Sequence, residues 1–110
     1  TTDTSALTAI ANDCGYDAVF SRQIEALCTP ADAVIAISTS GNSPNVVRGI
    51  QAAREAGAFT VGLAGGDGGE VARLAHRCFT VDSPSTARVQ EAHILIGHML
   101  CDWIEEKSVG

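Results

Sequence analysis

The chain has 110 residues, a formal net charge of −6 and a pI near 4.8, with 45% hydrophobic but only 5% aromatic residues. The acidic balance argues against nucleic acid as a partner, because phosphate backbones bind basic surfaces. No apolar run is long enough to cross a membrane and the first residues do not resemble a signal peptide, so we expect one small cytoplasmic domain that binds no membrane.

The pattern along the chain predicts alternating helices and strands. In chain order these are a helix at 17–28, a strand at 33–38, a helix at 44–56, a strand at 59–64, a short helix at 69–76, a strand at 78–83 and a long helix from about 86 to 106. The strands are short and almost wholly apolar, which is typical of strands covered on both faces. We therefore expect a parallel α/β sheet, which three strands leave incomplete at one edge unless more chain or another subunit extends it.

Two predicted helices carry broad apolar stripes. In the helix at 17–28 the stripe consists of Val19, Phe20, Ile24 and Leu27. In the helix at 44–56 the stripe ends before Gly57, a residue typical of a helix C-terminus.

The four cysteines, Cys14, Cys28, Cys78 and Cys101, are widely spaced and include no C-x-x-C pair. This spacing favours reduced, mostly structural thiols over a disulfide framework or a zinc site.

Hydroxyl side chains gather directly after the first predicted strand, in ISTSGNSPN (37–45). In parallel α/β folds ligands bind beyond the carboxyl ends of the strands. Ser43 followed by Pro44 is typical of an N-cap and first helical residue, and a helix N-terminus favours an anion. We interpret this loop as a site for a phosphomonoester; the alternative is a simple cap with ordinary turn residues. The lack of a G-K-[ST] sequence argues against a nucleotide-binding P-loop.

A glycine-rich stretch, GLAGGDGGE (62–70), follows the second strand in the same way. Its glycines could approach a ligand, but a flexible connection before a helix is the more ordinary interpretation. Asp67 is a candidate cap of that helix.

Three motifs together resemble a known family. They are TSALTAIAND (4–13), ISTSGNSPNV (37–46) and ARVQEAHILIGHML (87–100), and the chain is similar to the sugar isomerase (SIS) domain, in particular to the phosphoheptose isomerases. The resemblance implies a three-layer αβα SIS domain with a parallel sheet. Residues 1–110 would be its C-terminal portion, incomplete on the N-terminal side.

The resemblance also implies an activity and its residues. Family members interconvert sedoheptulose 7-phosphate and D-glycero-D-manno-heptose 7-phosphate through an enediol, in the biosynthesis of ADP-heptose for lipopolysaccharide. His98 matches the catalytic histidine, and an imidazole suits proton transfer near neutral pH. His76 and His93 match no such position and are expected to be packing or surface residues. The positions that match substrate contacts are Asn12, Asp13, Ser38, Thr39, Ser40, Ser43 and Gln90.

The match breaks at the front of the chain. The family's catalytic glutamate lies on an N-terminal helix that has no counterpart here, and Glu25, Glu55 and Glu70 lie in no matching motif. Ala87 stands where many relatives have an aspartate, which leaves the exact substrate contacts open.

Zinc is a further expectation from the resemblance, since some relatives bind it through residues equivalent to Gln90 and His98. Eight residues on one straight helix span about 12 Å, too far for both to reach one ion. A bent helix or a second subunit would therefore be needed.

The resemblance further implies a homotetramer, and the last helix offers apolar residues for it. Its stripe is Val89, Leu95, Ile96, Met99, Leu100 and Trp103. Ile96, Met99 and Trp103 are the candidates for a subunit contact, and the chain's own core is the alternative. Two other functions stay open: a non-catalytic relative that binds the replication initiator protein, and a sugar-phosphate sensor of a transcription regulator. Ser40 and His98 favour the isomerase over the first.

Overall fold

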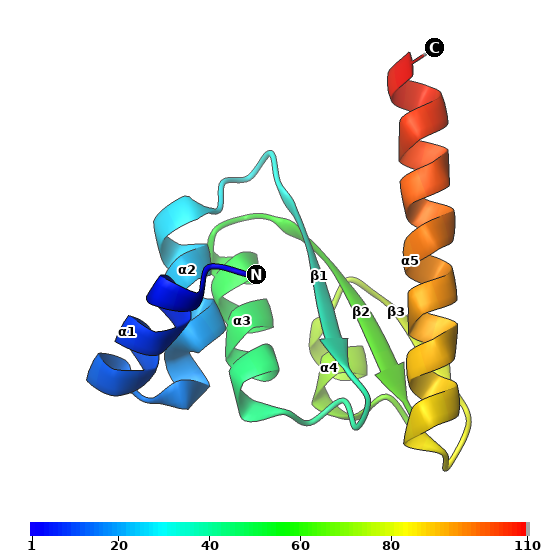
Figure 1. The fold of residues 1–110 in the computed structure, drawn as a ribbon, viewed down its shortest axis with the longest axis horizontal. Helices are drawn as coiled ribbons and strands as arrows, with labels where there is room; N and C mark the ends of the chain where they lie inside the picture. Colours follow the sequence, from blue (N-terminus) through cyan, green and yellow to red (C-terminus); the bar gives the residue numbers. More distant parts are fainter. Residues whose placement is uncertain (110) are drawn as a thin grey trace.

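The computed structural model of the chain describes residues 1–109 (Figure 1). Its elements are α1 (Thr4–Cys14), the 3-10 helix η1 (Tyr16–Ala18), α2 (Val19–Leu27), β1 (Ala33–Ser38), α3 (Pro44–Glu55), β2 (Phe59–Gly65), α4 (Gly69–Leu74), β3 (Arg77–Val81) and α5 (Thr86–Val109). Every predicted strand and helix is confirmed, with ends that differ by a few residues. Helix α1 was not predicted. Its N-cap is Asp3, whose Oδ1 accepts the Ala6 N–H at 3.0 Å.

The three strands form one parallel sheet in the order β1-β2-β3. In the register, Ser38 pairs with Ala64 at the end of β1, and Gly65 pairs with Val81 at the end of β2. The carboxyl ends of all three strands therefore meet at one edge of the sheet, at the bottom of Figure 1. This is the edge at which the hydroxyl loop was predicted to lie.

Helices α3 and α4 cover one face of the sheet. The core cluster there consists of Ala36, Ile50, Ala64 and Val71. At Gly62 an added Cβ would lie 2.5 Å from Val71 Cγ1, so α4 packs directly on the backbone of β2. Complete burial of aliphatic side chains such as Ile50 contributes about 1.5–3 kcal/mol each.

The opposite face is mostly bare in this chain. Helix α5 packs there, beside the carboxyl half of β2 (Figure 1). Ile35, Ile37 and Phe79 stay about half exposed, at 49%, 56% and 49%. The prediction of strands covered on both faces is wrong for this chain, because the second helical layer is a single helix.

Helix α2 packs against α3 rather than against the sheet. A Cβ at Gly49 of α3 would lie 3.4 Å from Phe20 Cβ and 3.5 Å from Ile24 Cδ1. Val19 is fully buried, but Leu27 is 77% exposed, so the predicted stripe is wrong at that residue. Leu27 is the last residue of α2, where the chain leaves the helix at the extended residue Cys28. The predicted end of α3 is confirmed by Gly57, which has a positive φ of 80°.

All four cysteines are free, as predicted, but Cys14 and Cys101 are exposed and so play no part in a core. Among residues 1–109, no helix has the length and apolar character needed to cross a bilayer.

Candidate functional site

The hydroxyls of the loop after β1 converge on Ser38. This residue is only 5% exposed, and its Oγ lies 2.9 Å from Ser43 Oγ and 3.5 Å from Ser40 Oγ. The same Oγ accepts the Gly41 N–H at 3.1 Å. Three hydroxyls, from the last residue of β1 and the loop that follows it, thus share a small volume at the carboxyl edge of the sheet.

Ser43 has the predicted position but not the predicted bond. It is the N-cap residue of α3 and Pro44 follows as the first helical residue, yet the hydroxyl makes no bond to a backbone N–H of the helix. The cause is its bond to Ser38, which turns the Ser43 hydroxyl towards the loop. The hydroxyl therefore belongs to the polar cluster, and the 12-residue helix α3 adds its partial positive N-terminus.

The glycine-rich loop after β2 is tied to the hydroxyl loop. Gly41 O accepts the Val71 N–H at 2.9 Å, and Asn42 Oδ1 accepts the Glu70 N–H at 3.0 Å. Gly41 has a φ of +74°, and an added Cβ would lie 2.1 Å from Gly68 O. The interpretation of this stretch as a flexible connection is wrong, because it packs against its neighbour along a row of backbone contacts.

Two side chains cap the start of α4. Asp67 Oδ1 accepts the Gly69 N–H at 2.9 Å, which confirms the predicted cap. Asn42 was missed as a cap, since it lies 28 residues before Glu70 in the chain. The sequence offered one indication: Gly68 at the N-cap has no side chain, so a residue from elsewhere could cap the helix.

Charge is absent from residues 37–45, so an anion bound there would meet only uncharged donors: hydroxyls, backbone N–H groups and the amides of Asn42 and Asn45. Nearby on α4, a hydrogen bond and ion pair with Arg73 lower the pKa of the Glu70 carboxyl, and the same contacts raise the pKa of Arg73. Both side chains are exposed and therefore contribute little to stability. That contribution is present at neutral pH and is lost as the pH falls through the lowered pKa of Glu70.

The first turns of α5 lie against the same edge of the sheet. A Cβ at Gly65 would lie 2.6 Å from Thr39 O and 2.9 Å from Val89 Cγ2. Val89 is 2% exposed, and Gln90 follows it as an exposed residue. The structure therefore places Gln90 at the end of α5 that adjoins the hydroxyl loop.

Four predicted site residues, Gln90 among them, make no hydrogen bond to the loop within residues 1–109. His98 is exposed and lies two turns beyond Gln90 on the unbroken helix α5. Asn12 and Asp13 are exposed at the end of α1 and bond to each other, Asn12 Nδ2 donating to Asp13 Oδ1 at 3.1 Å. Their helix packs against η1 and α2, on the far side of α3 from β2 (Figure 1).

Zinc does not fit Gln90 and His98 of one chain, because eight residues on the continuous helix α5 separate their Cα atoms by about 12 Å. Within residues 1–109, no three His, Cys, Asp or Glu side chains are grouped to hold a metal. Zinc binding stays a prediction that needs residues from outside this chain.

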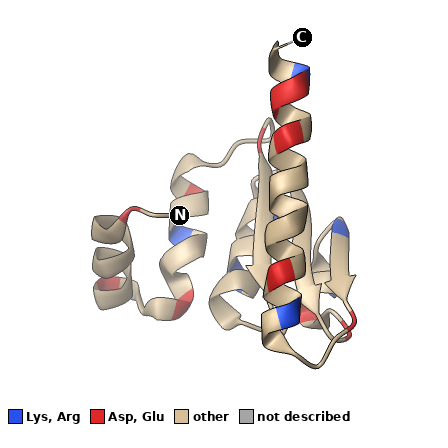
Figure 2. Ribbon diagram, turned by 45° about the vertical axis from the view of Figure 1, so that its right-hand side comes forward, with Lys and Arg blue, Asp and Glu red and all other residues tan. Residues whose placement is uncertain are grey.

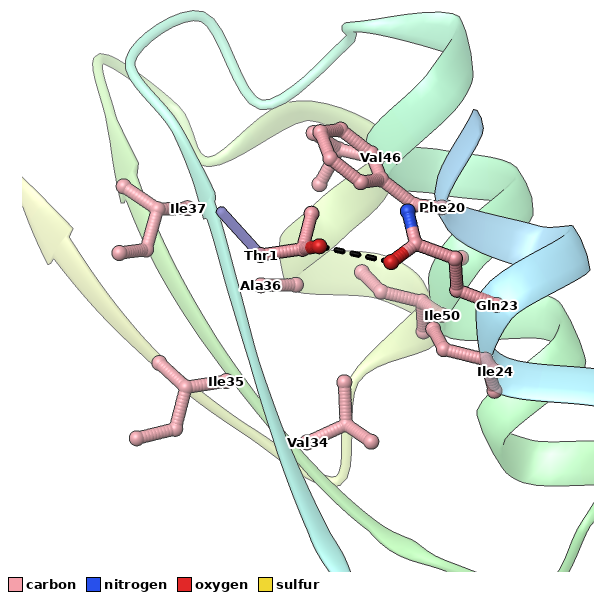
Figure 3. Close-up of a pocket in the computed structure, with 11 residues that line it drawn as sticks. Thr1, Phe20, Gln23, Ile24, Val34, Ile35, Ala36, Ile37, Val46 and Ile50 are labelled. Carbon is pink, nitrogen blue, oxygen red and sulfur yellow. Dashed lines mark hydrogen bonds between the residues drawn. The ribbon is translucent and has the colours of Figure 1, made fainter. Parts of the chain in front are cut away.

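A separate apolar pocket of about 400 Å³ lies beside β1, between that strand and helices α2 and α3 (Figure 3). Its walls include Phe20, Ile24, Val34 and Ile50, and the Thr1 hydroxyl donates to Gln23 Oε1 across it at 2.7 Å. The pocket runs along the free edge of the sheet. Its walls are mostly apolar and include none of Ser38, Ser40 and Ser43, so it is distinct from the hydroxyl cluster.

These features define a parallel α/β domain with a candidate anion site at the carboxyl edge of its sheet. A sequence model described as the SIS domain matches residues 1–65. The chain therefore belongs to the SIS domain family.

The most informative relatives are phosphoheptose isomerases. That of Aquifex aeolicus is 54% identical over 106 residues, which cover 96% of this chain and 56% of the relative. That of Sulfurimonas denitrificans is 54% identical over 110 residues, which cover 100% of this chain and 56% of the relative. The solved phosphoheptose isomerase GmhA of Neisseria gonorrhoeae has a TM-score of 0.91 at 48% identity, over 96% of this chain and 59% of that one.

The resemblance inferred from the three motifs is thus confirmed, and so is the α/β fold. The chain spans little more than half the length of these relatives, 56% of each of the first two. The alternative of a non-catalytic regulator of replication initiation gains no support from these matches.

Proposed function

We propose that the protein is a phosphoheptose isomerase, which interconverts sedoheptulose 7-phosphate and D-glycero-D-manno-heptose 7-phosphate. The observation that carries the proposal is the convergence of Ser38, Ser40 and Ser43 at the carboxyl edge of the sheet. The chain also resembles phosphoheptose isomerases of about half-identical sequence over nearly its whole length. The product would supply the heptose for ADP-heptose and lipopolysaccharide.

The phosphate group would lie at the hydroxyl loop. Each hydroxyl can donate one hydrogen bond to a phosphate oxygen, and bonds to an ionised acceptor are stronger than neutral ones. Thr39 adds a fourth hydroxyl, and the N-terminus of α3 adds a favourable field. The contacts between loops at Gly41 and Asn42 would hold these donors in place before the ligand arrives, which lowers the entropic cost of binding.

The isomerisation itself moves two protons. A base removes a proton from C1 of the ketose to give an enediol, and a proton returned to C2 gives the aldose, while a hydroxyl proton passes between O2 and O1. His98 would transfer protons between the oxygens, and the base at carbon would be a glutamate outside this chain. Gln90, Asn12 and Asp13 would bind the hydroxyls of the sugar.

The second half of α5 supports the proposal of a homotetramer. Met99 and Trp103 are 61% and 58% exposed in the single chain, so they are not part of its own core. In Figure 2 the charged residues of α5 lie in its first turns and near its C-terminal end, and the stretch 92–101 between them is uncharged. Packing of two such helices would place His98 close to a subunit interface. The assembly would work in the cytoplasm, with zinc as a further ligand only if several segments supply the ligands.

The test is an NMR time course with sedoheptulose 7-phosphate, run in parallel on the full-length protein and on the 110-residue chain. We expect the full-length protein to form the aldose product and the short chain to form none, since it lacks the base. If the full-length protein binds the sugar phosphate without turnover, the activity is wrong and a regulatory role takes its place. If it does not bind, the phosphate site is wrong as well.

A further inference from the structure

Helix α5 contains a second histidine, His93, that the proposed mechanism does not use. His93 is only 4% exposed, and its Nε2 lies 3.0 Å from Ala64 O. Its Nδ1 is buried and has no hydrogen-bond partner in the part of the chain that the structure describes. Burial of an imidazole costs free energy unless the ring is hydrogen-bonded, so the bond at Nε2 offsets part of the cost of burying His93.

The partner of Nε2 fixes the position of the proton. A carbonyl oxygen can only accept, so Nε2 must donate and the ring carries its proton there. Nδ1 has no partner among the described residues, so the bond at Nε2 alone fixes the orientation of the ring.

The bond attaches α5 to the carboxyl end of β2, next to the hydroxyl loop. Val89 and His93 are the only buried residues among the described residues of α5, and both contact the carboxyl end of β2. Ala64, which accepts the bond, pairs in the sheet with Ser38, the common partner of the hydroxyl cluster. The chain of contacts from Ser38 through Ala64 to His93 thus joins the hydroxyl loop to the helix that carries Gln90 and His98.

We propose that His93 is a positioning residue: its Nε2–H bond to Ala64 O sets the distance between the hydroxyl loop and the side chains of Gln90 and His98. This inference depends on the proposed function, because it assigns those side chains to the same substrate. A displacement of about 1 Å between groups that hold one substrate costs up to about a hundredfold in rate. An ordinary packing role would affect only the stability of the fold.

The spectroscopic test uses the full-length protein with ¹⁵N-labelled histidine. A long-range ¹H–¹⁵N spectrum at neutral pH should show a proton on His93 Nε2, with the signal assigned by its loss in His93→Gln. An unprotonated Nε2, as in the Nδ1–H tautomer, would overturn the proposed bond, because it could not donate to Ala64 O.

The kinetic test compares three replacements in the full-length protein. His93→Gln keeps an N–H donor at a similar reach, His93→Asn places the same amide on a shorter side chain, and His93→Leu fills the space without a donor. We expect kcat for sedoheptulose 7-phosphate to stay near wild type in the Gln variant and to fall about tenfold or more in the other two. Affinity for inorganic phosphate should stay unchanged in all three, because the hydroxyl loop is untouched.

Equal kcat in the Gln and Asn variants overturns the inference, and this comparison remains valid if the Leu variant does not fold. If the wild-type enzyme is active and the variants are equally active, the positioning role is wrong but the proposed function stands. A wild-type protein that neither converts nor binds sedoheptulose 7-phosphate removes the proposed function, and the inference fails with it. If it binds without turnover, the same comparison is made with the dissociation constant, and equal constants overturn the positioning role.

Discussion

Asn42 Oδ1 accepts the backbone N–H of Glu70 at 3.0 Å, so a side chain from the loop after β1 caps the helix that follows β2. On its other side, Asn42 Nδ2 donates to Ser40 O at 3.3 Å. One amide therefore spans the two loops at the carboxyl edge of the sheet. The Asn42 side chain thereby ties the backbone of the hydroxyl loop to the start of α4.

Replacement Asn42→Ala should lower the free energy of unfolding by about 0.5–2 kcal/mol, as loss of a helix cap does elsewhere. The matched control is Asn42→Asp, which keeps an acceptor for the Glu70 N–H and should retain most of the stability. Urea unfolding of the three proteins measures the difference. Equal midpoints for the Ala variant and wild type would show that the contact between the loops contributes nothing.

Gly41→Ala should lower the free energy of unfolding by more than the strain of a positive φ alone explains. The new Cβ would lie 2.1 Å from Gly68 O, so the two loops must move apart. Gly66 is a close control, because its φ is +59° but an added Cβ has no atom within 4 Å. We expect Gly66→Ala to cost about 1 kcal/mol and Gly41→Ala clearly more, by thermal or urea unfolding. A cost at Gly41 no larger than at Gly66 would contradict the close approach.

Ser38→Ala or Ser43→Ala should weaken sugar-phosphate binding by about 1 kcal/mol or more, because each removes a hydrogen bond to an ionised oxygen. Isothermal titration calorimetry of the full-length protein gives the affinity directly. Ser5→Ala, on exposed α1, is the control for loss of a serine far from the loop. Unchanged affinity in both loop variants would refute the assignment of the phosphate to this loop.

His98→Ala should reduce turnover strongly while the affinity for sedoheptulose 7-phosphate changes little, since an acid–base group acts mainly in the transition state. His76→Ala is the control and should lower stability without changing turnover. His76 Nδ1 accepts the Thr60 N–H at 3.0 Å at the start of β2, so its loss should cost about 1 kcal/mol of stability and leave kcat unchanged. Equal turnover by the His98 variant and wild type would move the acid–base role to another residue.

Trp103→Glu should dissociate the proposed homotetramer, because it places a charge in the exposed apolar stripe of α5. Light scattering at micromolar concentration should then report a smaller species than wild type. Lys107→Glu on the same helix is the charge control and should leave the assembly intact. A wild-type protein that is already monomeric would exclude the proposed contact.

The sequence predicted the features that local pattern determines. Apolar runs located β1 and β2 to within a residue, and Gly57 located the end of α3 because only a positive φ suits that position. The position of the hydroxyl loop followed from the rule that parallel strands share a carboxyl edge.

What local pattern could not give was contact between distant segments. The bond from Asn42 to Glu70 and the bond from His93 to Ala64 join residues 28 and 29 positions apart. His93 was therefore expected only to be a packing or surface residue, and the structure adds that it is buried with a bond to Ala64 O. The exposure of Leu27 and of the second sheet face likewise depends on how much chain lies around each element.

Helix α5 is attached to the rest of the chain near its N-terminal end, through the buried residues Val89 and His93. The described residues beyond His93 extend the helix by about 24 Å, away from its contacts with β2 (Figure 1). A tilt of about 10° at the two buried residues would move the far end by about 4 Å. A partner bound to the far half of this helix would therefore change the orientation of His98 relative to the sheet.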